Sequence, residues 1–109
     1  MRLNYLAAMG ALVVAAGCGG PAPGKVQGSC KTSSLKCIEI IGYAASVVQS
    51  NMQACGAAWS TKPCDRATTL GGCQFITVDG ITLHWYYGML AADAQYACKA
   101  EGGYWLATP

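Results

Sequence analysis

Charge is scarce in this chain. Seven basic and five acidic residues make up 11% of its 109 residues, and the lysines and arginines stand singly along the sequence. No basic run or stripe is present of the kind that neutralises a phosphate backbone, so we expect no nucleic-acid partner. Hydrophobic residues make up 53% of the chain. This is too many for a disordered protein, and the length allows one ordinary domain.

The sequence also lacks the patterns that usually carry catalysis or metal binding. It has a single histidine, His84, and no Cys-x-x-Cys pair, so a zinc site is not expected. No Gly-x-Ser-x-Gly motif is present, and Gly71-Gly72 and Gly102-Gly103 lack the spacing of a phosphate-binding loop. The sequence leaves open a catalytic pair of carboxylates formed by Glu39 and Asp65, although no other feature favours such a pair. We therefore expect no catalytic residues, no cofactor and no metal.

Cysteine, by contrast, is abundant, with seven residues in the chain. Such density in a short sequence is typical of a disulfide framework formed outside the cytosol. The odd count is explained if Cys18 has another role, because the remaining six could then form three bridges. These six are Cys30, Cys37, Cys55, Cys64, Cys73 and Cys98.

Residues 1–17 have the layout of a secretory signal. Arg2 is their only charged residue, an apolar stretch follows it, and small residues precede Cys18. Ala15-Ala16-Gly17-Cys18 resembles the lipobox of bacterial lipoproteins, with Ala15 where leucine is commoner. The resemblance implies cleavage before Cys18 and acylation, including palmitate, that anchors the chain to a membrane. An ordinary secretory signal is the alternative, and it would leave this thiol unpaired in an oxidising compartment.

The same resemblance implies a location in the cell envelope, with the membrane as a partner through lipid on Cys18. In a cell with two membranes Gly19 favours the outer one, because Asp at that position is the usual inner-membrane signal of lipoproteins. Glycine and proline dominate the residues that follow, so we interpret 18–27 as a tether and 28–109 as the stapled domain. Together with Cys-x-x-x-Gly-Gly-x-Trp starting at Cys98, these features resemble small cysteine-rich envelope lipoproteins of unassigned function.

The domain is expected to have an α+β fold. Asp79-Gly80 between two β-rich runs in 75–87 predicts a hairpin with a two-residue turn, in which Val78 would face Ile81. Residues 29–31 and 35–41 predict a weaker hairpin. Helical spacing of apolar residues predicts helices over 43–55 and 89–101. About four antiparallel strands would then form a sheet with two helices packed on it, and 102–106 could add an edge strand.

Side-chain alternation separates two faces of this sheet, and His84 and Tyr86 share one face with Cys73, opposite the aliphatic residues. The two halves of the domain also resemble a diverged repeat, each with a strand cysteine, a helix cysteine and a tryptophan. The faces count against pairing the strand cysteine with the helix cysteine of each half, and six cysteines allow 15 pairings. The repeat nevertheless favours three particular bridges, namely Cys37–Cys55, Cys73–Cys98 and Cys30–Cys64.

Aromatic rings supply the only candidate recognition surface. The residues concerned are His84, Trp85, Tyr86, Tyr87, Trp59 and Trp105, with Tyr104 beside them. Exposed Trp and Tyr stack on sugars and are enriched in protein interfaces, although such rings also fill cores. The first functional hypothesis is a non-catalytic envelope protein that presents a disulfide-stabilised module to another protein through the face bearing His84 and Tyr86. The alternative is glycan or peptidoglycan binding, and an enzyme ranks third.

Overall fold

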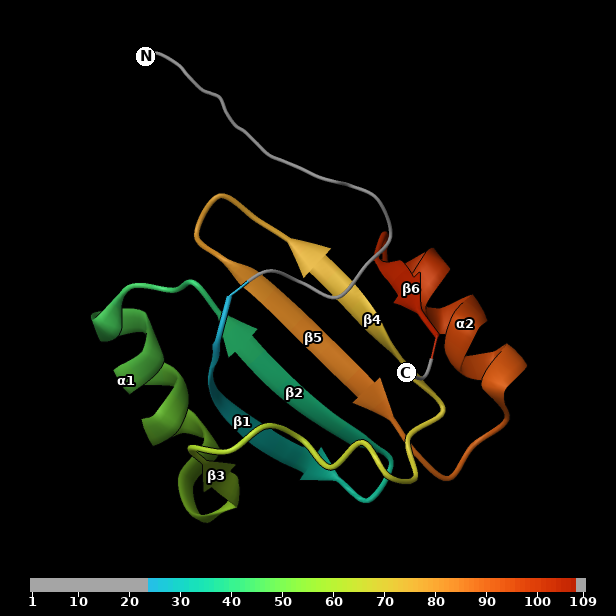
Figure 1. The fold of residues 1–109 in the computed structure, drawn as a ribbon, viewed down its shortest axis with the longest axis horizontal. Helices are drawn as coiled ribbons and strands as arrows, with labels where there is room; N and C mark the ends of the chain where they lie inside the picture. The colour runs from blue at the N-terminus through green and yellow to red at the C-terminus, as the bar shows by residue number, and fades with distance from the viewer. Residues whose placement is uncertain (1–23, 108–109) are drawn as a thin grey trace.

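The computed structural model describes residues 24–107, which form one antiparallel sheet and two helices (Figure 1). Along the chain the elements are β1 (Val26–Ser33), β2 (Lys36–Ile41), α1 (Ala45–Cys55), the 3-10 turn η4 (Gly56–Ala58), β3 (Trp59–Ser60), β4 (Gly71–Ile76), β5 (Ile81–Tyr86), α2 (Ala91–Ala100) and β6 (Tyr104–Leu106). The sheet order is β3-β1-β2-β5-β4-β6. The expected α+β class, both hairpins and both helices are confirmed. The signal, Cys18 and most of the tether lie outside the described residues.

The sheet has six strands rather than about four. The two additional strands are β3, with two residues, and β6, with three, and each pairs at an edge of the sheet. Runs this short show no period-2 alternation, so sequence patterning does not detect them. β6 lies within 102–106, the segment where the sequence allows an additional edge strand. β1 begins at Val26, two residues inside the segment interpreted as tether.

The β4–β5 hairpin differs from the prediction in its turn. Ile76 pairs with Ile81, so residues 77–80 form a four-residue loop where two residues were expected. Thr77 closes this loop: its backbone N–H donates to the Gly80 carbonyl at 2.9 Å, and its hydroxyl accepts the N–H groups of Asp79 and Gly80, both at 3.2 Å. The pairing shifts by two residues, so the division between the two faces is unchanged.

The two halves of the domain share a ββαβ arrangement. In each half a hairpin is followed by a helix and then by a short strand that returns beside the first strand of the hairpin. Cys30 of β1 and Cys73 of β4 are equivalent, because each lies opposite a tryptophan, Trp59 and Trp105 respectively. Their disulfides have the same sequence separation of 25. The repeat therefore exists, but its first half is aligned on Cys30 and not on Cys37.

Both helices cover the same face of the sheet, called the helix face below. Its residues include the cross-strand neighbours Cys30, Ile38, His84 and Cys73, which lie in one row across four strands. α1 packs on β1, whereas α2 packs on β4 and β6. Figure 1 shows the two helices toward opposite edges of the sheet, with β2 and β5 between them. The helices therefore flank the middle of the helix face, where Ile38 and His84 are half-buried and Ile40 is buried.

The opposite face, called the loop face, is covered by the segment between the two halves. Its core contains Cys37, Leu83 and Trp85 of the sheet, with Cys64 of the covering segment packed against them. The loop face therefore has its own buried core, and an irregular segment covers it in place of a helix.

Each of the three disulfides fixes one covering element. Cys30–Cys55 joins α1 to the helix face, Cys73–Cys98 joins α2 to that face, and Cys37–Cys64 joins the connecting segment to the loop face. The structure thus contains the expected Cys73–Cys98 bridge. The expected pairs Cys37–Cys55 and Cys30–Cys64 are wrong, because Cys37 lies on the loop face while α1 lies on the other.

Candidate functional site

A row of six side chains crosses the helix face from edge to edge. In order across the sheet the row contains Trp59, Cys30, Ile38, His84, Cys73 and Trp105. The two disulfides that hold the helices lie on either side of its centre. Ile38 and His84 form that centre, and both are half-buried. We call these two residues, together with half-buried Thr82 and buried Ile40 beside them, the central strip.

The tryptophans at the ends of the row pack on glycine. A Cβ atom at Gly28 would overlap the ring of Trp59, and a Cβ atom at Gly71 would overlap the ring of Trp105. Each ring therefore lies directly against the backbone of the neighbouring strand, and both rings are half-buried. This packing fixes the edges of the helix face and leaves the central strip between two rigid margins.

His84 is the titratable group of the central strip. Its ring lies 4.9 Å from the ring of Phe75, centroid to centroid. Burial lowers the pKa of His84, as does the positive charge of Lys36, while Glu101 acts in the opposite direction. The imidazole is therefore expected to be neutral at pH 7. Its Nδ1 atom is buried and has no hydrogen-bond partner among residues 24–107.

Tyrosines close the two ends of the central strip. The hydroxyl groups of Tyr43 and Thr82 share a hydrogen bond of 2.7 Å, which fixes Tyr43 over one end. At the other end the ring of Tyr86 stacks on Trp105 with centroids 6.2 Å apart, and Lys36 places its ammonium group 5.8 Å from the Tyr86 ring. Burial raises the pKa of Tyr86, and the negative charge of Glu101 adds to this effect.

The aromatic residues expected as a recognition surface do not form one surface. His84, Tyr86, Trp59 and Trp105 belong to the helix face, whereas Trp85 and Tyr87 lie on the loop side. Trp85 and Tyr86 are only 5% and 4% exposed and serve the two cores. Tyr104 of β6 is exposed, and the prediction missed the exposed ring of Tyr96 of α2. Exposure at every third or fourth residue of a short helix is difficult to read from one sequence.

Glu39 and Asp65 do not act as a pair. Glu39 is fully buried on the loop face, where its carboxylate accepts the Cys64 N–H at 2.7 Å and binds Arg66 at 2.6 Å. Asp65 is exposed and uses its carboxylate to accept the N–H of Ala67 at 2.8 Å. The two carboxyl groups therefore have separate structural partners.

The described residues contain neither a metal-binding cluster nor a membrane span. Within 24–107 no three His, Cys, Asp or Glu side chains are placed to hold an ion, and neither helix is long and apolar enough to cross a membrane. Compared with known proteins, the chain matches no family model, no curated protein and no solved structure. Its function is therefore inferred from its own residues.

Proposed function

We propose that this chain is a lipid-anchored, non-catalytic protein of the cell envelope that presents its stapled domain to another envelope protein. One observation carries the proposal. All six cysteines within residues 24–107 are paired, so the seventh thiol belongs to Cys18 in the lipobox-like motif. Three disulfides suit an oxidising compartment, where a free thiol is a liability and an acylated cysteine is not.

Mass spectrometry of the protein purified from its native membranes tests the anchor. We expect a chain that begins at acylated Cys18 and contains no free thiol. The matched control is Cys18→Ser, which should lose the lipid mass and the membrane fraction while keeping all three disulfides. An unmodified Cys18, or a chain that still begins at Met1, would contradict the proposal.

The central strip is the part of the domain that we propose as the contact for a partner protein. The repeat supports this choice, because Ile38 and His84 occupy equivalent places, opposite Cys30 and Cys73 respectively. Ile38 indicates that an aliphatic side chain suits this position structurally. A histidine with a buried, unpartnered Nδ1 reduces stability there, since a polar group without a hydrogen bond costs about 1–3 kcal/mol when buried. A recognition role explains why a histidine occupies the position.

The variant His84→Ile separates recognition from stability. We expect it to fold as stably as the wild type or more so, and to lose a protein that the wild type retains from detergent-solubilised envelope extract. Lys99→Ala, an exposed change on α2, serves as the control and should retain that protein. Identical retention by all three chains would refute the role of the strip. Retention of glycans but not of proteins on parallel arrays would favour the glycan-binding alternative.

A further inference from the structure

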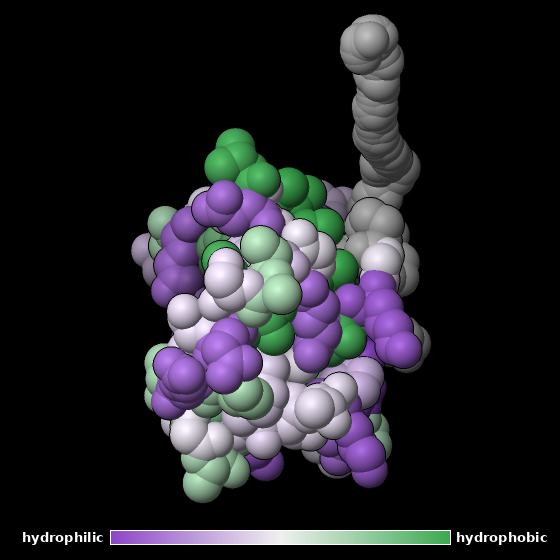
Figure 2. Space-filling view, turned by 90° about the vertical axis from the view of Figure 1, so that its left-hand side faces the viewer, coloured by the Kyte–Doolittle hydropathy of each residue, from purple (hydrophilic) through white to green (hydrophobic). Residues whose placement is uncertain are grey.

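The tip of the β4–β5 hairpin exposes two aliphatic side chains. Val78 is 102% exposed and Ile76 is 71% exposed, the former in the loop and the latter at the end of β4. In Figure 2 strongly hydrophobic atoms gather at this upper end of the molecule. Among residues 24–107 Val78 has the largest exposed fraction of any of the large hydrophobic side chains. Such a tip is suited to an apolar environment.

The loop pairs the N–H groups of Thr77, Asp79 and Gly80 internally. Thr77 binds the carbonyl of Gly80 through both its N–H and its hydroxyl, and the same hydroxyl accepts two further backbone N–H groups of the loop. Transfer from water to an apolar phase is costly mainly for unpaired polar groups. Three of the four N–H groups of residues 77–80 are therefore paired, which lowers the cost of carrying Val78 into the interfacial region of a bilayer.

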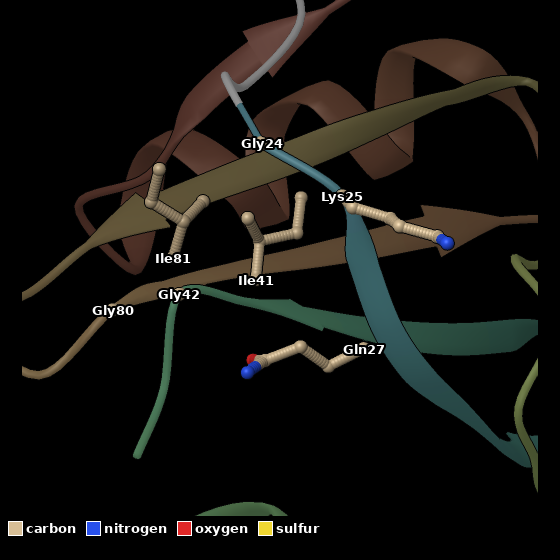
Figure 3. Close-up of a pocket in the computed structure, with 7 residues that line it drawn as sticks. All are labelled: Gly24, Lys25, Gln27, Ile41, Gly42, Gly80 and Ile81. Atoms are coloured by element: carbon tan, nitrogen blue, oxygen red, sulfur yellow. The ribbon is translucent and has the colours of Figure 1, made fainter. Parts of the chain in front are cut away.

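The chain enters the domain at the same end. Gly24 and Gly80 line one open hollow of about 540 Å³, and the side chains of Ile41 and Ile81 point from its floor toward the Gly24 segment (Figure 3). Gly80 directly follows Asp79 in the tip loop, so the entry of the chain lies beside the tip. Ile76 at the tip pairs with Ile81, which lines the hollow, so the tip and the hollow are joined by apolar side chains.

Five residues lie between Cys18 and Gly24, so six Cα–Cα steps separate the two. Because each step in an extended chain covers at most about 3.5 Å, this segment spans no more than roughly 20 Å. An acylated Cys18 would therefore hold the entry of the domain, and the tip beside it, close to the membrane surface.

We propose that the hairpin tip, Ile76 and Val78, inserts into the interfacial region of the bilayer that holds the acyl chains of Cys18. This inference rests on the proposed lipid anchor and adds an orientation to it: the long axis of β5 leads away from the membrane. The exposed carboxylate of Asp79 stays at the depth of the headgroups, where Lys25, at the entry of the chain, can also lie.

Brominated lipids, which quench tryptophan inside a bilayer, test the orientation. The acylated protein is placed in phosphatidylcholine vesicles with or without bromine on the acyl chains, once as Val78→Trp and once as Leu90→Trp. Leu90 is also 71% exposed, but it lies beyond the opposite end of β5. Emission of the native tryptophans is measured on the wild type and subtracted. We expect the added tryptophan of Val78→Trp to lose emission in brominated vesicles and to shift to the blue, while Leu90→Trp does neither.

The other outcomes overturn the inference. Equal quenching of both variants would mean that the domain lies on the membrane without this orientation. A blue shift at Val78→Trp without quenching would indicate that a second copy of the chain covers the tip. Mass spectrometry of the same sample separates the two proposals. Acylated Cys18 without quenching refutes only the insertion of the tip, whereas a chain without acylation refutes the anchor as well.

Discussion

The buried ion pair on the loop face should be strongly asymmetric in its response to mutation. Glu39 has no exposed surface, whereas 34% of the Arg66 side chain is exposed. The guanidinium group of Arg66 also lies 4.3 Å from the centroid of the Trp85 ring. Replacing Arg66 by Met should therefore destabilise the domain more than replacing Glu39 by Gln.

The magnitudes follow from what each variant leaves behind. Arg66→Met leaves a charged carboxylate fully buried with the Cys64 N–H as its remaining partner, and breaking a buried pair in this way costs about 3–5 kcal/mol. Glu39→Gln keeps the shape and an acceptor for that N–H but makes two charge-assisted hydrogen bonds neutral. Because Arg66 can turn into water, we expect a loss of only about 1–2 kcal/mol. The double variant should be more stable than Arg66→Met alone, since it contains no buried charge.

Urea unfolding at pH 7 with the disulfides intact, followed by tryptophan fluorescence, measures these differences. Lys99→Met, an exposed change on α2, is the control and should alter the free energy of unfolding by less than about 0.5 kcal/mol. Two results would refute this expectation: Glu39→Gln as destabilising as Arg66→Met, or a double variant no more stable than Arg66→Met. Burial of the carboxylate would then not be what determines the loss of stability.

Three further predictions follow from the helix face. Lowering the pH from about 7.5 to about 5 should reduce the stability of the wild type more than that of His84→Ile. Burial lowers the folded-state pKa of His84, so the unfolded state takes up more protons as the pH falls below about 6.5. Urea midpoints of both proteins at both pH values test this prediction. Gly103→Ala should destabilise the domain by about 1–3 kcal/mol in the same assay, because its Cβ would overlap the sulfur of Cys73. In the double variant Cys30→Ala/Cys55→Ala, backbone amides of α1 should exchange hydrogen faster while the sheet keeps its protection, because α1 has no buried residue to hold it in place. Simultaneous loss of protection in the sheet would show instead that the bridge stabilises the whole fold.

The fold class could be predicted from the sequence because its strongest signals are local. Asp79-Gly80 and the alternating residues around it produce the β4–β5 hairpin, and apolar residues at helical spacing produce α1 and α2. The register of that hairpin could not be predicted in the same way. It depends on the Thr77 hydroxyl, a single side chain that competes with strand pairing by binding backbone groups of the loop.

The disulfide pairing shows where local signals stop being sufficient. The rule that a strand cysteine pairs with the helix cysteine of the same half holds in both halves of the structure. The predicted pairing is wrong in the first half because it uses Cys37 as the strand cysteine there, whereas the structure uses Cys30. The equal separations of Cys30 from Cys55 and of Cys73 from Cys98 were the signal in the sequence that could have corrected it.

The candidate site was predictable only in part, for a related reason. Alternation correctly placed His84 and Tyr86 on one face, but it could not say that the two helices would lie on either side of the central strip. The same comparison of halves that corrects the cysteines gives the centre of this face its meaning. Position 38 has isoleucine and its equivalent position 84 has histidine; both lie beside a disulfide and a flanking helix, and His84 also packs against Phe75. Packing against Phe75 leaves the buried Nδ1 of His84 without a hydrogen-bond partner among residues 24–107, and this is the reason for proposing the central strip as the contact for a partner.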